Sequence, residues 1–325
     1  MEHIVMLLFR RVVRPIVMTK TFSAMLLCLT LLFAACTETT PNTQPQETQI
    51  ANNQSKEVNQ KGETLAVTPA SVSTNTIDVN GVSRTYLTYM PESASDSMPV
   101  IIQFHGGTGT AQDAYFTSNF DATADEEGIL MVYPQAETST GSVWNTIHAS
   151  EGNKVSSDDF GFIEAIINHL SEDSRIDTSR IYVAGYSNGA AMAYQIACHL
   201  NDQIAGFAVM SGNFPLEANY PCNITHETGG LIFNGTDDDT RPLEGIPGYA
   251  IPVREGAEWW ADQNNSIREQ TIQQGNVERT TYVTLSGTEI QLFIINGGGH
   301  VWFNFNVDGM PMNTFIWEFL SQYQT

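Results

Sequence analysis

The chain has 325 residues, enough for one large domain or two small ones, and its 42% apolar content is ordinary for a protein with a buried core. Its formal net charge of -22 at pH 7 reflects 36 acidic and 14 basic side chains, and four of the basic ones lie before residue 21. Such an acidic surface repels nucleic acid and anionic lipid or polymer, so nucleic-acid and polyanionic partners are excluded.

Residues 1–36 have the anatomy of an export signal. Basic residues precede an apolar stretch at 22–35, which is short for a bilayer span and ends in small residues. The ending Ala-Ala-Cys36 resembles the bacterial lipobox, in which the cysteine is lipidated and becomes the mature N-terminus. An ordinary secretory signal with an incidental Cys36 is the alternative. Met18 is a second candidate start, because it would begin a short basic segment of its own.

Residues 37–74 are predicted to form a disordered tether. They are rich in Thr, Gln, Asn, Glu and Pro and have few large apolar side chains, so they bury too little surface to offset the entropy lost on ordering. Behind a lipid anchor, the tether would hold a folded domain at 75–325 away from the membrane. Membrane contact is therefore expected only through that anchor, since no later stretch is long and apolar enough to cross a bilayer.

From residue 75 onward, the pattern alternates strands and helices. Apolar runs and alternation predict strands at 76–79, 84–90, 100–104, 129–133, 180–184, 204–210, 231–233, 281–285 and 290–295. Apolar residues at helical spacing predict helices at 160–170, 190–200, 253–262 and 313–323. This order indicates an α/β fold with a mostly parallel central sheet, helices on both faces and no large lid domain.

The segment 185–189, Gly-Tyr-Ser-Asn-Gly, fits the pattern G-x-S-x-G between a predicted strand and a predicted helix. This is the setting of a nucleophile elbow, where the serine occupies a strained turn and larger flanking residues would crowd the strand and helix. Ser187 is therefore the predicted nucleophile. The alternative is a glycine-rich turn without a chemical role. Such a turn would need neither the strand before it nor the helix after it.

A serine hydroxyl needs a base to remove its proton. In α/β-hydrolases the chain order is serine, acid, histidine. Of the three histidines that follow Ser187, His199 lies near the end of a predicted helix, where capping is the simpler role, so His226 and His300 remain. His300 comes directly after a glycine run at the end of a predicted strand, whereas His226 precedes the strand expected to carry the acid. His300 is therefore the predicted base, with an ordinary surface-loop histidine as the alternative. For the acid, three adjacent aspartates at 237–239 compete, and two of them are expected to form only a solvated turn.

An oxyanion hole needs two backbone N–H groups aimed at the developing charge. One is expected from Asn188, directly after the nucleophile. The other is expected from the segment 105–109, His-Gly-Gly-Thr-Gly, which follows a predicted buried strand, with Gly107 as the candidate. His105 would then shape the loop and not act as a base.

These residues together resemble the α/β-hydrolase esterases grouped with polyhydroxybutyrate depolymerases and feruloyl esterases. The resemblance runs from about residue 76 to the end, and its longest block is 158–194. The family's acid lies in a His-Gly-Thr-x-Asp segment, which reads Asn-Gly-Thr-Asp-Asp at 234–238 and implies Asp238 as the acid. The family's Gly-Gly-His-x-Trp matches 298–302, although Phe-Asn replaces the Pro-Gly that often follows.

Cys198 and Cys222 are the only cysteines after the predicted signal. Two cysteines in an exported domain predict a disulfide, with two buried free thiols as the alternative. The resemblance supports the pairing, because members of the family often carry a disulfide. Two cysteines are too few for a structural zinc site, and no metal or cofactor is expected.

The resemblance implies carboxylic-ester hydrolysis through an acyl-serine intermediate. The expected substrate is a small ester or oligosaccharide ester, either a feruloyl or other aryl ester of plant polysaccharide or a hydroxyalkanoate ester, met at the cell envelope or outside the cell. Trp144 and Trp302 are candidates for stacking on a sugar or aromatic ring, whereas core packing is favoured for Trp259 and Trp260 on a predicted helix. A peptidase on the same fold and a non-catalytic surface binding lipoprotein are the alternatives.

Overall fold

The computed structural model describes residues 71–147, 156–215 and 222–325, together with the backbone of two short paired strands, β1 (Glu57–Val58) and β2 (Thr64–Leu65). Residues 56–325 form one compact unit. The predicted export signal, including Cys36, lies outside the described residues. The β1–β2 pair falls within the predicted tether, and the main sheet starts a little before the expected boundary at residue 75.

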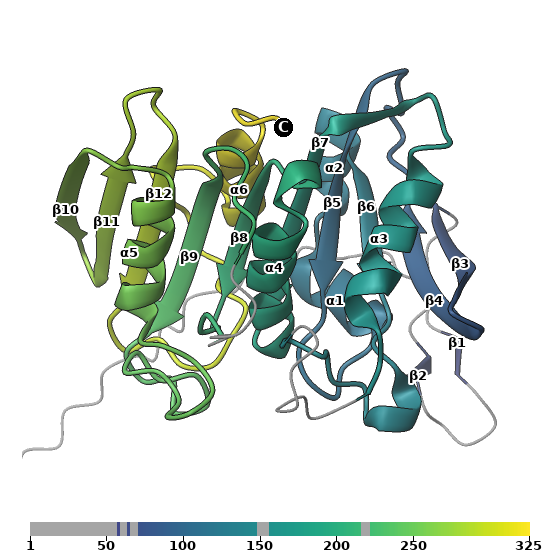
Figure 1. Cartoon of the computed structure of the whole chain (residues 1–325), viewed down its shortest axis with the longest axis horizontal. Helices are drawn as coiled ribbons and strands as arrows, with labels where there is room; N and C mark the ends of the chain where they lie inside the picture. Colours follow the sequence, from purple (N-terminus) through teal and green to yellow (C-terminus); the bar gives the residue numbers. More distant parts are fainter. Residues whose placement is uncertain (1–56, 59–63, 66–70, 148–155, 216–221) are drawn as a thin grey trace, which may run out of the picture. The chain divides into compact units, whose positions relative to one another are not determined.

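A ten-stranded sheet runs through the domain in the order β10-β11-β12-β9-β8-β7-β5-β6-β4-β3 (Figure 1). Its strands are β3 (Val72–Val79), β4 (Val82–Tyr89), β5 (Met98–Phe104), β6 (Leu130–Pro134), β7 (Ile176–Tyr186), β8 (Gly206–Met210), β9 (Gly229–Gly235), β10 (Arg268–Gln274), β11 (Val277–Val283) and β12 (Glu289–Ile295). The strands from β12 to β6 are parallel, and two antiparallel strands extend each edge. The mostly parallel centre confirms the predicted fold class.

Helices cover both faces of the sheet, as expected. They are α1 (Ala111–Ser118), α2 (Asp121–Glu127), α3 (Asp159–Leu170), α4 (Asn188–His199), α5 (Val253–Gln263) and α6 (Met312–Leu320). Helices α3, α4 and α5 pack on one face, toward the viewer in Figure 1, and α1, α2 and α6 pack on the other. Successive strand side chains point to opposite faces, so Ile102 joins the first apolar core and Ile101 the second.

Besides β1 and β2, one strand of the main sheet and two helices were not predicted from the sequence. Strand β10 lies at the sheet edge and most of its side chains are exposed, so it lacks an apolar pattern. Helix α2 is short and acidic. Helix α1 has little difference in hydrophobicity between its two faces. Its clearest feature is a capping box, in which the side chains of Thr110 and Asp113 each bind the other's backbone N–H. The strand expected at 281–285 overlaps the last part of the longer β11, which ends at Val283.

The segments that carry the predicted chemistry follow the carboxyl ends of parallel strands. Residues 105–109 follow β5, the elbow at 185–189 ends β7, the aspartates at 237–239 follow β9, and His300 follows β12. The carboxyl ends of parallel strands lie at one edge of a sheet, so segments far apart in the chain meet there.

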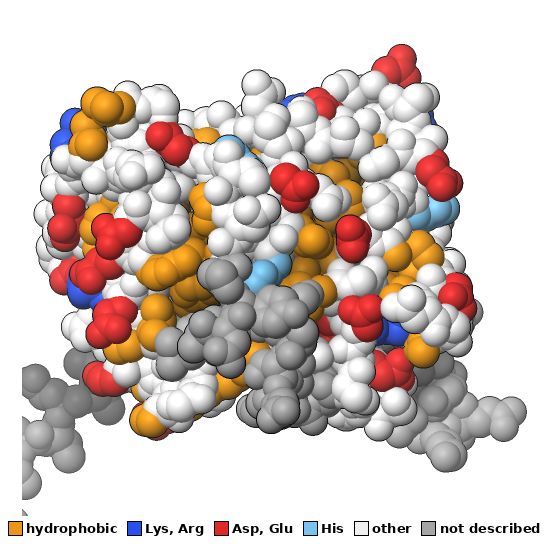
Figure 2. Space-filling view, viewed as in Figure 1, with side chains coloured by type: hydrophobic (Ala, Val, Ile, Leu, Met, Phe, Trp, Pro, Cys, Tyr) orange, Lys and Arg blue, Asp and Glu red, His pale blue; other side chains and the backbone are white. Residues whose placement is uncertain are grey.

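Acidic side chains are scattered over the face covered by α3, α4 and α5, with few basic ones between them (Figure 2). This agrees with the formal charge of -22. Among the described helices, none combines the length and apolarity needed to cross a bilayer.

Candidate active site

Ser187 sits at the turn between β7 and α4 in a backbone conformation that side chains rarely adopt, with φ 57° and ψ -116°. Its N–H donates to the carbonyl of Met210 at 3.0 Å, which ties the turn to the neighbouring strand. The flanking glycines have no room for a side chain. A Cβ at Gly185 would lie 2.2 Å from the Gly189 carbonyl oxygen, and one at Gly189 would lie 2.4 Å from that of His105. These close approaches explain the G-x-S-x-G spacing.

The structure brings Ser187, His300 and Asp238 into one chain of contacts. His300 Nε2 lies 2.8 Å from Ser187 Oγ, and its Nδ1 lies 2.8 Å from Asp238 Oδ2. A carboxylate at Nδ1 holds the proton on that nitrogen, which leaves Nε2 free to accept the serine proton. Ser187 is 8% exposed and Asp238 is 2% exposed, so the contacts are shielded from water.

Of the three competing aspartates, only Asp238 points at the imidazole. Its other oxygen, Oδ1, accepts the backbone N–H groups of Thr240 at 3.0 Å and Arg241 at 2.7 Å. Asp237 and Asp239 are exposed. The buried carboxylate is thus fully hydrogen-bonded, while its neighbours form the solvated turn that the sequence predicts for two of the three.

The loop that carries Asp238 and the loop that carries His300 are joined mainly through their main chains, with one threonine hydroxyl also taking part. The N–H of Asp237 donates to the Gly298 carbonyl at 2.9 Å, and the N–H of Gly297 donates to Thr236 Oγ1 at 2.8 Å. The two loops approach so closely that a Cβ at Gly235 would lie 1.9 Å from the Gly298 oxygen. Glycine at this position therefore lets the acid and the histidine meet.

Asn188 and Gly107, the two predicted oxyanion donors, lie side by side next to the nucleophile. Asn188 is the first residue of α4, so its N–H points out of the helix end, where the helix dipole favours negative charge. A Cβ at Gly107 would lie 3.5 Å from the Asn188 Cβ, and one at Gly106 would lie 3.6 Å from the Ser187 Cβ. The arrangement suits an oxygen that gains charge beside Ser187.

His105 shapes the loop that carries Gly107. It is 2% exposed, its Nε2 accepts the N–H of Ala136 at 3.1 Å, and its Nδ1 lies 2.7 Å from the Gly106 carbonyl oxygen. These contacts place the proton on Nδ1. Burial lowers the pKa of His105, so the ring stays neutral and holds the loop.

The prediction of Trp144 as a ring-stacking residue is wrong, because its side chain is 2% exposed. Its indole N–H donates to the His105 carbonyl at 2.9 Å, and its backbone N–H donates to Asn188 Oδ1 at 2.7 Å. Its ring also lies 4.8 Å from the His105 ring, between centroids. Trp144 therefore joins the two segments that carry the predicted oxyanion donors, a role that no local sequence pattern indicates.

A buried ion pair in turn holds the Trp144 segment. Asp159 is fully buried and accepts a hydrogen bond from Arg84 at 2.7 Å. Its other oxygen accepts the N–H of Asn145 at 2.7 Å and the hydroxyl of Ser157 at 2.9 Å. Although Asp159 lies within the block that carries the family resemblance, its contact with the segment that follows Trp144 is seen only in the structure.

Trp302 is partly buried and lines a pocket of about 310 Å³ beside the oxyanion loop. Its stacking role stays a prediction. Trp260 is fully buried and Trp259 packs against the same core, as expected. Within the described ranges, no group of three His, Cys, Asp or Glu side chains is placed to hold a metal ion.

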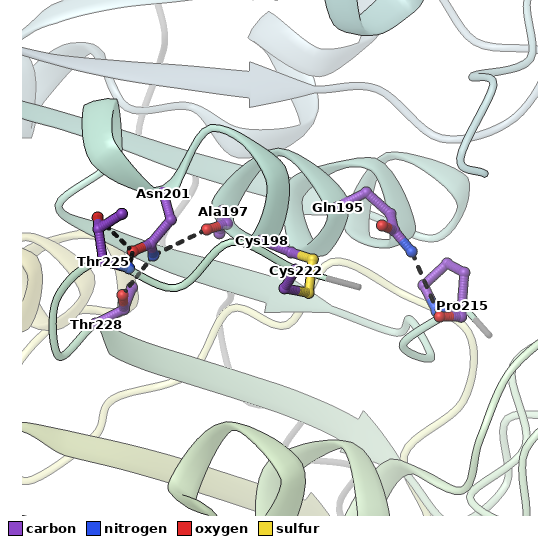
Figure 3. Close-up of a disulfide and its surroundings, with 8 residues drawn as sticks. All are labelled: Gln195, Ala197, Cys198, Asn201, Pro215, Cys222, Thr225 and Thr228. Atoms are coloured by element: carbon purple, nitrogen blue, oxygen red, sulfur yellow. Dashed lines mark hydrogen bonds between the residues drawn. A yellow bond between two sulfur atoms is a disulfide. The ribbon is translucent and has the colours of Figure 1, made fainter. Parts of the chain in front are cut away.

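Cys198 and Cys222 form a disulfide with a Cα–Cα distance of 4.9 Å, which confirms the predicted pair (Figure 3). It joins the end of α4 to the segment before β9. Asn201 reinforces the connection, since its Oδ1 accepts the N–H of Thr225 at 2.7 Å and its Nδ2 donates to Thr228 Oγ1 at 2.8 Å. The disulfide thus fixes the far end of the helix that begins at the nucleophile.

Residues 84–224 match the family described as Esterase PHB depolymerase. A bifunctional acetylxylan esterase/xylanase of Neocallimastix patriciarum is 24% identical over 247 residues, which cover 75% of this chain and 34% of that protein. Feruloyl esterase B of Piromyces equi is 25% identical over 238 residues, covering 69% of this chain and 42% of that protein. The matched segments thus make up 34% and 42% of the length of these two relatives.

Among solved structures, an acetyl xylan esterase from Aspergillus awamori superposes with a TM-score of 0.59 and 18% identity, covering 77% of this chain and 99% of that one. At this identity the likeness shows the shared α/β-hydrolase fold.

Proposed function

We propose that the domain, whose residues 84–224 match the Esterase PHB depolymerase family, is a serine esterase that removes acetyl or feruloyl groups from neutral plant polysaccharide of the xylan type. The observation that carries the proposal is the contact chain from Ser187 through His300 to Asp238, with 2.8 Å at each step. Similarity to acetylxylan and feruloyl esterases supports the substrate class.

The proposed reaction begins when Ser187 attacks the ester carbonyl and His300 Nε2 takes the hydroxyl proton. The tetrahedral oxyanion is stabilised by the N–H groups of Asn188 and Gly107. His300 then gives its proton to the leaving sugar oxygen, and an acyl-serine remains. Water then attacks the acyl group while His300 takes its proton, and His300 returns that proton to Ser187 Oγ as the acyl–oxygen bond breaks and the carboxylic acid leaves. Asp238 stabilises the imidazolium that forms in both steps.

The charge of the protein favours neutral substrates over anionic ones. A net charge of -22 repels polyanions. Within the site, the carboxylate of Asp238 is hydrogen-bonded to His300 and adds a further negative charge. Acylated xylan without acidic side groups therefore suits the surface better than an acidic polymer.

We further propose that residues 1–36 direct export, that Cys36 is lipidated, and that 37–74 tether the domain at 75–325 to the membrane. The disulfide supports export, because such bonds persist in oxidising compartments. The test is detergent-phase partitioning of the full chain expressed in a bacterium. The full chain should enter the detergent phase and a Cys36→Ala variant should not; equal partitioning would contradict lipidation.

The activity is tested by a hydrolysis panel on the purified domain, comprising acetylated xylan, methyl ferulate, a hydroxybutyrate trimer and a peptide amide. Acetate or ferulate should be released, and Ser187→Ala should lower turnover by about a millionfold, as nucleophile removal does elsewhere. Cleavage of the hydroxybutyrate trimer alone would overturn the polysaccharide assignment. Cleavage of the amide alone would favour a peptidase, and binding without cleavage would favour a surface binding protein.

A further inference from the structure

The pocket beside the oxyanion loop contains a buried polar group that the proposed mechanism does not use. Gln103 lines the pocket from β5 and is 1% exposed, and its Oε1 has no hydrogen-bond partner within the described part of the chain. Every other residue of β5 is apolar. A buried amide oxygen without a partner costs about 1–3 kcal/mol, so this side chain is costly unless something in the pocket binds it.

The remaining walls combine aromatic faces with polar groups. Tyr186 and Trp302 contribute aromatic rings to the lining, and Thr108, Asp113 and Thr117 contribute exposed polar side chains. An aromatic surface with several hydrogen-bonding groups around it suits a ring that has apolar faces and hydroxyls at its edge. The pocket's volume of about 310 Å³ is sufficient for a single sugar ring with room for water.

The charges of the pocket favour a neutral ring. Asp113 is the one charged side chain among the described residues that line it. Its Oδ2 accepts the N–H and the hydroxyl of Thr110, each at 2.8 Å, which holds the carboxylate at the start of α1. A fixed carboxylate accepts hydrogen bonds from sugar hydroxyls and repels a uronate.

The pocket adjoins the histidine side of the site. Tyr186 donates its hydroxyl to the His300 carbonyl at 2.9 Å, and the two rings lie 5.0 Å apart between centroids. A Cβ at Gly106, which also lines the pocket, would lie 3.0 Å from the Tyr186 ring and 3.6 Å from the Ser187 Cβ. Because His300 must protonate the leaving oxygen, the alcohol half of an ester lies toward this side.

We propose that this pocket is a subsite for one neutral pyranose ring of the ester's alcohol half, with the Gln103 amide hydrogen-bonded to a ring hydroxyl and the ring resting on Trp302. A hydroxyl both donates and accepts, so it satisfies either orientation of the amide. The inference rests on the proposed function, because it assigns the position of the sugar that the esterase releases.

The test compares two acetyl esters that differ only in the alcohol, acetylated xylobiose and 4-nitrophenyl acetate. In Gln103→Met, which keeps the side-chain length without the amide, the ratio of kcat/KM for the sugar ester to that for the phenyl ester should fall about tenfold. The matched control is Gln195→Met. Gln195 is another buried glutamine with an unpartnered Oε1 in the described structure, but it lies on α4 and does not line the pocket. Its ratio should stay as in the wild type.

A second variant keeps the proposal testable if Gln103→Met fails to fold. Thr117 is exposed on α1 at the pocket rim, so Thr117→Phe should fill the pocket without disturbing the core and should lower the same ratio. Free xylobiose should inhibit wild-type hydrolysis of 4-nitrophenyl acetate competitively, and Thr117→Phe should abolish this inhibition.

The two proposals fail in different ways. A wild-type enzyme that cleaves 4-nitrophenyl acetate but no acetylated sugar contradicts the proposed function. The subsite is contradicted if the wild-type enzyme cleaves acetylated xylobiose and both pocket variants have the same ratio of kcat/KM for the sugar ester to that for the phenyl ester. It is also contradicted if free xylobiose does not inhibit the wild-type enzyme.

Discussion

The two halves of the active site are held in place by different means. On the triad side, the loops after β9 and β12 are joined through backbone atoms around Gly235 and Gly298. On the predicted oxyanion side, the segments are joined by buried side chains, with Trp144 bound to both and Asp159 bound to the N–H of Asn145, the next residue.

The difference shows where each half is vulnerable. A main-chain junction tolerates many side-chain changes but demands glycine where two backbones nearly touch. A side-chain junction accepts ordinary backbone geometry but depends on single buried hydrogen bonds, each costly to leave unmade. Substitutions on the two sides should therefore affect turnover through different causes.

The largest expected effect in this comparison is on the triad side at Asp238. Asp238→Asn should keep the fold but favour the wrong imidazole tautomer, lowering kcat about ten-thousandfold by analogy with the serine-protease triad. Steady-state kinetics on 4-nitrophenyl acetate measures it. Asp237→Asn and Asp239→Asn are the matched controls, because both neighbours are exposed. If either control is as damaging as Asp238→Asn, the acid is misassigned.

The next effect tests the main-chain junction. Gly235→Ala would place a methyl group 1.9 Å from the Gly298 oxygen, so the His300 loop must move. A misplacement of about 1 Å costs about a hundredfold in kcat. Gly299→Ala is the control, since a Cβ there meets no atom within 4 Å. Equal activity of the two variants would show that the junction does not position His300.

A smaller effect is expected on the oxyanion side. Trp144→Phe removes the indole N–H that binds the His105 carbonyl and keeps most of the ring. We expect a roughly tenfold fall in kcat with KM nearly constant, because a displaced donor weakens stabilisation of the transition state more than binding.

The control for this variant is Trp260→Phe. Trp260 is also fully buried, but its Nε1 has no hydrogen-bond partner among the described residues. Its kcat should stay close to that of the wild type. A rise in KM with unchanged kcat in Trp144→Phe would instead indicate a substrate-binding role, which the burial of Trp144 argues against.

The smallest effect on turnover is expected at the disulfide, far along α4 from Ser187. The bond joins positions 24 apart, and a loop of that order contributes about 3 kcal/mol to stability. Cys198→Ala with Cys222→Ala should lower the free energy of unfolding by that amount and leave kcat within about twofold. Denaturant unfolding measures the first value. Two titratable thiols in unreduced wild-type protein would refute the bond.

The order of the central strands and helices was predictable because buried strands and amphipathic helices leave periodic apolar patterns. Strand β10 was not predictable because most of its side chains are exposed. Helix α2 is short, and helix α1 has only a weak difference between an apolar and a polar face. Edge and surface elements are held by partners distant in sequence, and a local pattern does not record those partners.

The sequence by itself determined the elbow around Ser187, because a strand, a strained turn and a helix are local features with their own residue requirements. It also predicted His300 as the base, through its place after a glycine run at a strand end, and the pairing of Cys198 with Cys222. Only the tertiary structure decided that Trp144 is a buried junction and that Gln103 faces a pocket. It also shows the carboxylate of Asp238, not those of its neighbours, against the imidazole. Burial and orientation depend on chain segments that meet across the sheet edge, and neighbouring residues in sequence do not specify which side chain turns inward there.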